Sequence, residues 1–298
     1  MTSADFASNR DNFCYRHPDR QSFVLCQRCL RTICPECQTP AAVGVVCPEC
    51  MKAQQSAQTT AQRKAERRWT RSRPVVVSDT RPLATYAIIG ITAIAYIVSL
   101  IPGFGRTVEN FLLFWAPTLY PPLTGTFEPW RILTVALVHS GFWHIGLNML
   151  ALWLIGRSLE PLLGRGRFVA LYLLSTAGGS VAVTLLSFGT PVVGASGAIF
   201  GLFGALIVIG RHIGLNIAGI AVILGVNLAI GFIPGFNVSW QAHVGGLVVG
   251  LLVGFIFTRT RAQRQQKTQL LLLGAVGAGL VLLLVVPVFT VLPPYIGL

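Results

Sequence analysis

A single serine lies among glycines in one apolar stretch, and a histidine in another apolar stretch could activate it. Ser196 lies in the run PVVGASGAIFGLFG at residues 191–204, and His243 follows in a later stretch. A serine hydroxyl is a weak nucleophile until a base within hydrogen-bond reach takes its proton, and neutral imidazole is the usual base near pH 7. The pair therefore predicts nucleophilic catalysis, although glycine and serine at this spacing also serve simply to bring membrane helices together.

Other polar residues could stabilise the oxyanion that such a reaction forms. His144 and Asn148 are four residues apart, so they project from one face of a helix and can converge on one oxygen. The N–H groups around Gly197 are expected at a helix N-terminus, where unsatisfied donors suit a negative charge. No aspartate follows Asp79, and Glu160 is the only acid beyond Glu128. A Ser-His-Asp triad is thereby excluded, and a dyad with a histidine held by packing is predicted.

The N-terminal segment carries a second set of chemically active residues. All seven cysteines fall before residue 51, and they form CxxC or CxxH pairs with one histidine. No apolar signal segment follows the N-terminal charges, so we expect this segment in the reducing cytoplasm, where paired cysteines indicate metal rather than disulfides. Eight ligands predict two structural zinc ions, held by Cys14, His17, Cys26, Cys29, Cys34, Cys37, Cys47 and Cys50.

The spacing of these pairs resembles the B-box and related cross-braced zinc fingers. The resemblance implies that alternate pairs share an ion, so that Cys14, His17, Cys34 and Cys37 bind one zinc and the other four cysteines bind the second. Sequential pairing is the alternative. Such a head is expected to dock a protein partner or to regulate the chain.

The remaining chain has the composition of a polytopic membrane protein, with 53% hydrophobic and 11% charged residues overall. Several of the apolar spans are short for a bilayer, which needs about 20 helical residues. Seven spans are predicted, at Leu83 to Ile101, Trp143 to Leu159, Phe168 to Phe188, Ser196 to Ile209, Leu215 to Ile233, Trp240 to Thr258, and Leu270 to Val291.

Basic residues predict the orientation of these spans. By the positive-inside rule, the loops after the second, fourth and sixth spans are cytoplasmic, which places the N-terminus inside and the C-terminus outside the cell membrane. The net charge of +13 is explained by this topology, and nucleic-acid binding is not expected. The basic residues of these loops are Arg157, Arg165, Arg167, Arg211, Arg259, Arg261, Arg264 and Lys267.

Four motifs in order resemble the rhomboid family of intramembrane serine proteases. They are Trp130-Arg131, His139-x4-His144-x3-Asn148, Gly194-Ala195-Ser196-Gly197 and Ala242-His243-Val244-Gly245-Gly246. The resemblance implies an all-α, six-helix core with a seventh, C-terminal helix. It also implies Ser196 as the nucleophile, His243 as the base, and an oxyanion hole formed by His144, Asn148 and the Ser196 N–H. Gly194 and Gly197 shape the loop and helix N-terminus at the nucleophile.

The expected domains follow from these patterns. They are a zinc-binding domain at 1–53, a basic linker at 54–82, the protease core at 83–258, and a loop with the seventh helix at 259–298. The family resemblance implies membrane-protein substrates that are cut within a transmembrane segment near the outer face of the bilayer. A rhomboid-like protein that binds spans without cutting is the main alternative. A transporter is disfavoured because internal repeats and paired broken helices are not found.

Small residues are expected to bring the catalytic spans together. His243, Gly246 and Gly250 share one face of the sixth span, and Gly197, Gly201 and Gly204 lie along the fourth. Small faces let two backbones approach until a serine and a histidine can touch. Phe200, one turn after Ser196, is expected to stack on the histidine.

Overall fold

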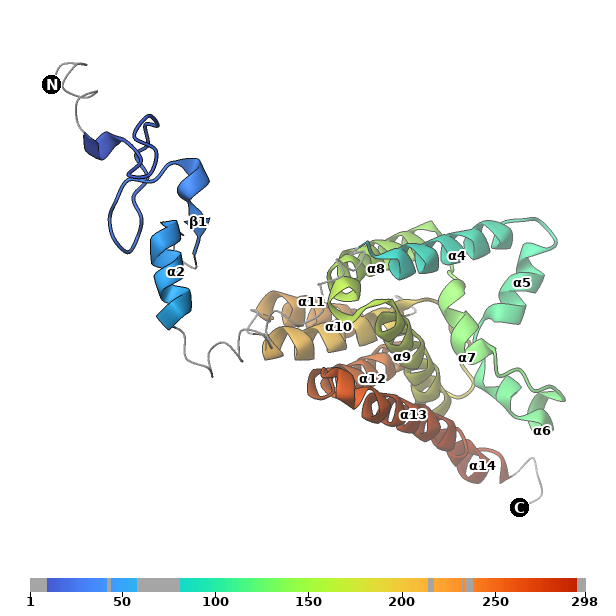
Figure 1. Ribbon diagram of the computed structural model, residues 1–298. Coiled ribbons are helices and arrows are strands. Elements are labelled where there is room, and N and C mark those ends of the chain that lie inside the picture. Colours follow the sequence, from blue (N-terminus) through green and yellow to red (C-terminus); the bar gives the residue numbers. More distant parts are fainter. Residues whose placement is uncertain are drawn as a thin grey trace. The chain divides into compact units, whose positions relative to one another are not determined.

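The chain folds into two compact units, Met1–Ser78 and Asp79–Leu298 (Figure 1). The computed structural model describes residues 10–41, 44–57, 81–213, 217–231, 233 and 238–293. Most of the predicted linker lies outside the described residues. The bounds of the four segments proposed above stay predictions.

The N-terminal unit is small and has a core built largely from cysteines. Its elements are η1 (Arg10–Asn12), η2 (Pro35–Cys37), an antiparallel pair of strands β1 (Thr39–Pro40) and β2 (Val45–Val46), and α2 (Pro48–Ala57). Five cysteines are buried there with Ile33 and Val46. So few apolar side chains rarely hold a fold of this size alone, and a unit this small usually depends on an additional staple.

The second unit is all-helical and contains a helix for each of the seven predicted spans. Three of them, α9, α12 and the α13–α14 pair, are long and apolar enough to cross a membrane, and a bent α7–α8 pair makes a fourth candidate. The others are shorter apolar helices, as predicted. The spans are α4 (Leu83–Ser99), α8 (Phe142–Leu163), α9 (Arg165–Leu186), α10 (Ser196–His212), α11 (Ala218–Ile230), α12 (Trp240–Arg259), and α13 (Gln266–Leu283) with α14 (Val286–Thr290).

Helices α10 and α12 run parallel and touch through small residues at intervals of one turn. A Cβ atom on Gly246 would collide with the backbone of Gly197, and one on Gly250 would collide with that of Gly201. One turn further, Gly254 meets Ala205. The predicted small faces are therefore confirmed, and they set the two backbones in van der Waals contact from the first turn of each helix onward.

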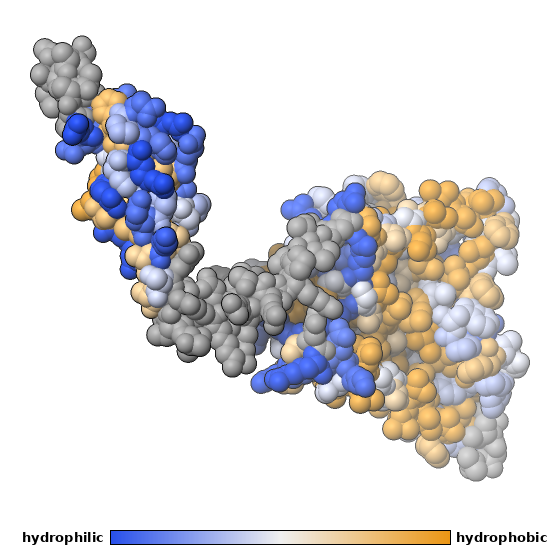
Figure 2. All heavy atoms as spheres, in the orientation of Figure 1, coloured by the Kyte–Doolittle hydropathy of each residue, from blue (hydrophilic) through white to orange (hydrophobic). Residues whose placement is uncertain are grey.

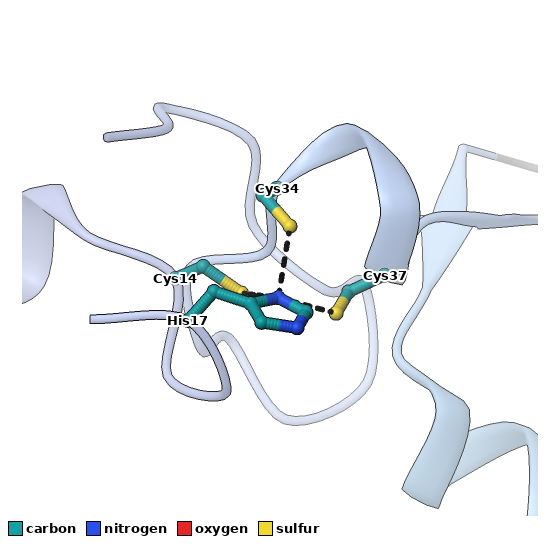
Figure 3. Close-up of side chains that lie close together, drawn as sticks. All are labelled: Cys14, His17, Cys34 and Cys37. Carbon is teal, nitrogen blue, oxygen red and sulfur yellow. Dashed lines mark hydrogen bonds between the residues drawn. The ribbon is translucent and has the colours of Figure 1, made fainter. Parts of the chain in front are cut away.

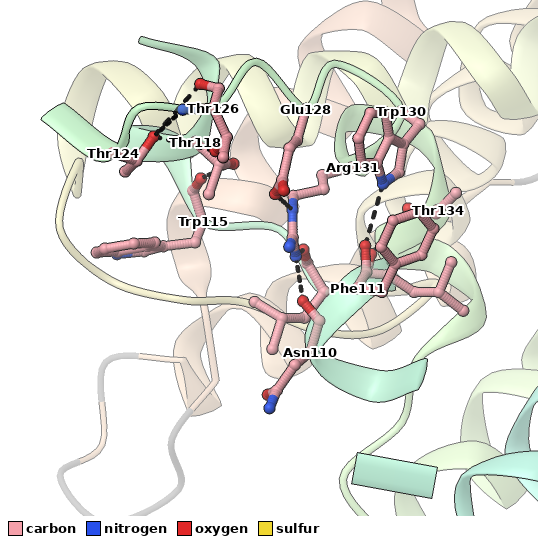
Figure 4. A network of polar contacts seen from close by, with 12 residues as sticks. Asn110, Phe111, Trp115, Thr118, Thr124, Thr126, Glu128, Trp130, Arg131 and Thr134 are labelled. Carbon is pink, nitrogen blue, oxygen red and sulfur yellow. Dashed lines mark hydrogen bonds and ion pairs between the residues drawn. The ribbon is translucent and has the colours of Figure 1, made fainter. Parts of the chain in front are cut away.

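The segment between α4 and α8 is built from short helices held by side-chain bonds to backbone. It comprises α5 (Gly105–Leu112), η3 (Ala116–Leu119), α6 (Pro121–Thr124), α7 (Arg131–Thr134) and η4 (Val135–Leu137). Arg131 pairs with Glu128 and donates to the carbonyl group of Asn110 (Figure 4). It also donates to the carbonyl group of Leu113. The Arg131–Glu128 pair therefore anchors this segment.

Hydrogen bonds fasten the seventh span at its start and at its break, so it does more than lie against the core. At its start, Gln269 accepts a hydrogen bond from Arg167 at 2.7 Å and donates to the Thr260 hydroxyl at 2.7 Å. At its break, the Leu284 carbonyl accepts a hydrogen bond from the Tyr120 hydroxyl at 2.7 Å. These bonds connect α13 to α9, to the end of α12 and to the segment between α4 and α8.

Charged residues collect at one end of the helical unit. The end of α12 and the starts of α9 and α13 meet at the Gln269 bonds, and α10 ends there too because it runs parallel to α12. Figure 2 shows hydrophilic side chains gathered at one edge of this unit, with hydrophobic ones covering the middle. This is the surface of a multi-pass membrane protein.

A buried carboxylate joins α8 to the start of α4. The Glu160 side chain is 2% exposed and accepts hydrogen bonds from the N–H groups of Ala84 and Thr85 at 2.9 and 2.8 Å, and from the Thr85 hydroxyl at 2.7 Å. The first N–H groups of a helix have no partner within it, so Glu160 caps α4 from a neighbouring helix.

Replacing Glu160 with alanine is expected to destabilise the helical unit by about 3 kcal/mol or more, because each stranded buried donor costs about 1–3 kcal/mol. Thermal unfolding in detergent measures the change. Glu160→Gln retains one acceptor oxygen and should lose less. An alanine variant as stable as the unmodified chain would contradict this role.

Candidate active site and metal centres

Ser196 is the first residue of α10, and the loop before it is shaped to present its backbone. Gly194 has φ +120°, a conformation that favours glycine, and its N–H donates to the Val135 carbonyl at 3.0 Å. The first intrahelical bonds leave the N–H groups of Ser196, Gly197 and Ala198 outside the helical ladder. These donors, at the positive end of the helix dipole, suit an oxyanion formed beside the serine.

His144 and the Ser196 hydroxyl lie around one point in front of Gly194. A Cβ atom built on Gly194 would lie 2.8 Å from His144 Nε2 and 3.8 Å from Ser196 Oγ. Any side chain at residue 194 would therefore displace the imidazole. The absence of one leaves a small space into which Nε2 of His144 faces, next to the serine.

His243 reaches the same helix face from α12. The imidazole is 6% exposed and stacks on the ring of Phe200, with ring centroids 4.0 Å apart and an interplanar angle of 13°. Phe200 and Ser196 share one face of α10, since residues four apart lie above one another. Gly197 approaches the carbonyl of Ala242, the residue before His243. The predicted stacking is confirmed. It orients the His243 ring by packing, in the role that a carboxylate has in a Ser-His-Asp triad.

Two further atoms of the site are buried with no hydrogen-bond partner in the described part of the chain, namely Nδ1 of His243 and Oδ1 of Asn148. The amide nitrogen of Asn148 donates to the His144 carbonyl at 2.8 Å. This nitrogen has two hydrogens, so one stays available for a substrate oxygen. His144 and Asn148 thus lie one turn apart on α8, as their spacing predicted.

The loop before Ser196 is held by contacts that sequence reasoning missed. Phe114 and Val192 exchange two backbone hydrogen bonds, at 3.1 and 2.8 Å. The Ala195 N–H donates to Nε2 of His139 at 3.5 Å, and Ser140 contacts Nδ1 of His144. Ser140 could have been suspected because it stands four residues before His144. The Phe114–Val192 bridge leaves no local signal in the sequence.

Comparison with known proteins matches this arrangement to one family. Residues 126–260 match the Rhomboid domain. This range includes every site residue described above that lies between Glu128 and Thr260. This match covers somewhat under half of the chain, which is similar to the rhomboid family over these residues. The chain is 36% identical over 183 residues to the Rhomboid protease GluP of Bacillus subtilis, covering 59% of this chain and 35% of that protein.

Other rhomboid-named proteins are also similar to this chain. RHOMBOID-like protein 1 of Arabidopsis thaliana is 38% identical over 137 residues, covering 44% of this chain and 35% of that protein. Rhomboid protein 1, mitochondrial, of Saccharomyces cerevisiae is 29% identical over 201 residues, covering 62% and 56%. The chain thus spans between about a third and somewhat over half the length of these relatives. Serine protease activity is supported at the level of the family.

The cysteines and histidine of the N-terminal unit form two clusters outside the rhomboid domain. Cys14, His17, Cys34 and Cys37 make one (Figure 3), and Cys26, Cys29, Cys47 and Cys50 make the other. All ligand atoms of a cluster lie within 4.8 Å of one another. The cross-braced grouping is therefore confirmed and sequential pairing is wrong. Either cluster could bind a metal ion.

The spacing of the ligand atoms fits a tetrahedral ion. Sulfurs bound to zinc at about 2.3 Å in a tetrahedron are about 3.8 Å apart. The Cys29 and Cys47 sulfurs are 3.7 Å apart, and Nδ1 of His17 lies 3.3 and 3.5 Å from the sulfurs of Cys34 and Cys37. All seven cysteines are free of disulfides. The donor set, thiolate with one imidazole, is the one that zinc prefers.

Charge crowding in the clusters favours a cation. Burial raises the pKa of the Cys37 thiol to about 11, and the neighbouring sulfurs of Cys14 and Cys34 add to the rise. Hydrogen bonding with Cys47 raises the pKa of Cys50 to about 12. Burial also acts on Cys14, but backbone N–H groups outweigh it and lower that pKa to about 6. One thiol of a cluster thus loses its proton readily, whereas a second thiol keeps its proton unless a metal ion offsets the negative charge.

Proposed function

We propose that this chain is an intramembrane serine endopeptidase that cuts transmembrane segments of other membrane proteins. The observation that carries the proposal is the convergence on one point of the Ser196 hydroxyl, Nε2 of His144 and the start of α10, beside a histidine held by stacking. A serine, a base and clustered donors are the parts that acyl transfer needs.

Each residue has a role in the proposed reaction. The Ser196 hydroxyl oxygen attacks the scissile carbonyl while His243 takes the hydroxyl proton as general base. His144, Asn148 and the Ser196 N–H stabilise the oxyanion, and Gly194 and Gly197 keep these donors close. His243 then gives the proton to the leaving amine, and water hydrolyses the acyl-enzyme through the same base.

The location of the site supports a cut near the outer face of a cell membrane. Ser196 and His243 lie at the ends of α10 and α12 opposite the basic end. With that basic end cytoplasmic by the positive-inside rule, the N-terminus is inside, the C-terminus is outside, and water reaches the serine from the outer side. The name of one relative places it in mitochondria, so fractionation of tagged cells should accompany any test of the location.

A serine-reactive fluorophosphonate probe tests the proposal directly. The full-length chain in detergent should be labelled at Ser196, and His243→Ala should lose labelling because the hydroxyl then lacks a base. Mass spectrometry of the labelled peptide identifies the modified residue. Equal labelling of both forms would overturn the dyad. Labelling without cleavage of any membrane-protein substrate would instead favour a rhomboid-like protein that binds spans and does not cut them.

We also propose that each N-terminal cluster binds a structural zinc ion and that the folded head docks a protein partner in the cytoplasm. Both proposals rest on the ligand spacing of the two clusters. Because all four positions of each tetrahedron are protein ligands, the ions would serve the fold rather than catalysis.

Removal of metal is expected to unfold the head and leave the membrane helices intact, since a structural zinc contributes about 10 kcal/mol or more to folding. Elemental analysis should find two zinc ions per chain before chelation. Hydrogen exchange then compares residues 10–57 with the helical unit. Cys14→Ser should lose one ion and keep the second. A chelated chain whose head amides stay protected would show that metal is dispensable.

A further inference from the structure

The imidazole of His144 is held in one of its two neutral forms by the residue four positions before it. The Ser140 backbone N–H donates to Nδ1 of His144 at 3.4 Å, and the Ser140 hydroxyl lies 3.0 Å from the same nitrogen. A backbone N–H can only donate, so Nδ1 must offer a lone pair. In a neutral ring the proton then sits on Nε2.

The protonated nitrogen faces the serine. Nε2 of His144 is the atom nearest to a Cβ built on Gly194, and Ser196 Oγ lies beside that same position. His144 therefore presents a hydrogen-bond donor to the space where a substrate oxygen would gain negative charge. In the opposite form, Nε2 would present a lone pair to that oxygen and repel it.

The same reasoning separates the three histidines near Ser196. Nε2 of His139 already accepts a hydrogen bond from the Ala195 N–H at 3.5 Å, so its available lone pair is used by the loop. Nε2 of His144 carries a proton. His243 is the remaining candidate, because its Nδ1 has no hydrogen-bond partner in the part of the chain that the structure describes and its ring stacks against the serine-bearing helix face. This assignment of the base does not depend on resemblance to other proteins.

We propose that Ser140 is a positioning residue that fixes His144 as the Nε2–H form and thereby makes it a donor in the oxyanion hole instead of a second base. The inference rests on the proposed serine protease function. Ser140 itself is exposed and touches His144 rather than the reacting atoms. Its hydroxyl adds to the backbone bond, which a substitution of the side chain would leave in place.

Nitrogen-15 NMR of full-length chain labelled at histidine tests the tautomer independently of catalysis. The sequence has five histidines, and His144→Gln identifies the His144 signals by their loss. At neutral pH the Nε2 of His144 should be protonated and its Nδ1 unprotonated. Protonation at Nδ1 in the unmodified chain would overturn the inference, whether or not the chain cleaves substrates.

Substitution of Ser140 tests the functional part. Ser140→Ala keeps the longer backbone bond of 3.4 Å but removes the hydroxyl contact of 3.0 Å, which weakens the preference for the Nε2–H form. A fraction of the Nδ1–H form should then appear, and kcat should fall about threefold to tenfold with KM unchanged, the effect of one neutral hydrogen bond. Ser140→Thr, which keeps the hydroxyl, should restore both readouts. Ser158→Ala, an exposed serine later on α8, serves as the matched control. A fall in kcat for Ser140→Ala with unchanged His144 signals would overturn the positioning role. An unmodified chain with the expected tautomer and no protease activity would refute the proposed function alone.

Discussion

Replacing Ser196 with alanine is expected to lower turnover of a membrane-protein substrate by about a millionfold, to the background of the assay. Loss of the nucleophile removes the acyl-enzyme route, and in a well-studied serine protease such a loss costs about that much. The change deletes one partly buried hydroxyl at the start of α10 and leaves the glycine contacts between α10 and α12 untouched. Melting temperature in detergent should therefore stay the same.

The measurement is cleavage of a fluorescent substrate with one transmembrane segment, in detergent and again in liposomes. Ser187→Ala, whose hydroxyl bonds to Thr190 in the loop before the nucleophile, is the matched control and should keep its activity. Undiminished cleavage by Ser196→Ala would show that catalysis does not take place at this site. Loss of activity in both variants would point to the loop rather than to the serine.

Replacing Gly246 with alanine is expected to reduce cleavage by about a hundredfold or more, although the change removes none of the catalytic groups. A Cβ atom at this position would collide with the backbone of Gly197, which cannot move aside as a flexible side chain could. The two helices must separate, and a displacement of about 1 Å between reacting groups can cost about a hundredfold in rate. Overpacking should also cost about 1–3 kcal/mol of stability.

Gly274→Ala is the control for this change, because a Cβ atom on Gly274 of α13 would meet nothing within 4 Å. Comparing kcat/KM with thermal stability separates the two effects. A Gly246→Ala chain that unfolds at a lower temperature but cleaves normally while folded would refute the claim that this contact sets the distance between Ser196 and His243. Normal stability and activity would refute the contact itself.

Much of this protein is predictable from local patterns. Runs of apolar residues predict the seven membrane helices because the length and apolar composition of each segment decide whether that segment is stable in a bilayer. The CxxC and CxxH pairs predict metal ligands because a two-residue spacer brings both side chains to one ion. The four-residue spacing of His144 and Asn148 predicts a shared helix face for the same kind of reason. Each of these depends on neighbours in the chain.

Contacts between distant residues depend on packing instead, and only the tertiary structure decides them. Glu160 caps α4, a helix that begins 77 positions earlier in the chain at Leu83. Its bonds to the N–H groups of Ala84 and Thr85 connect residues 76 and 75 positions apart, and no periodicity marks that pairing. The choice between cross-braced and sequential metal pairs likewise depends on how the head folds back on itself.

The sequence by itself determined the membrane spans, the ligand pairs and the residue types of a serine-histidine site. The tertiary structure decided which histidine nitrogen faces Ser196, how the seventh helix is fastened through Gln269 and Tyr120, and which backbone groups hold the loop at Val192. The physical reason is that hydropathy and ligand spacing act within a segment, whereas tautomers, caps and loop bridges need donors and acceptors from different segments to meet at hydrogen-bond distance.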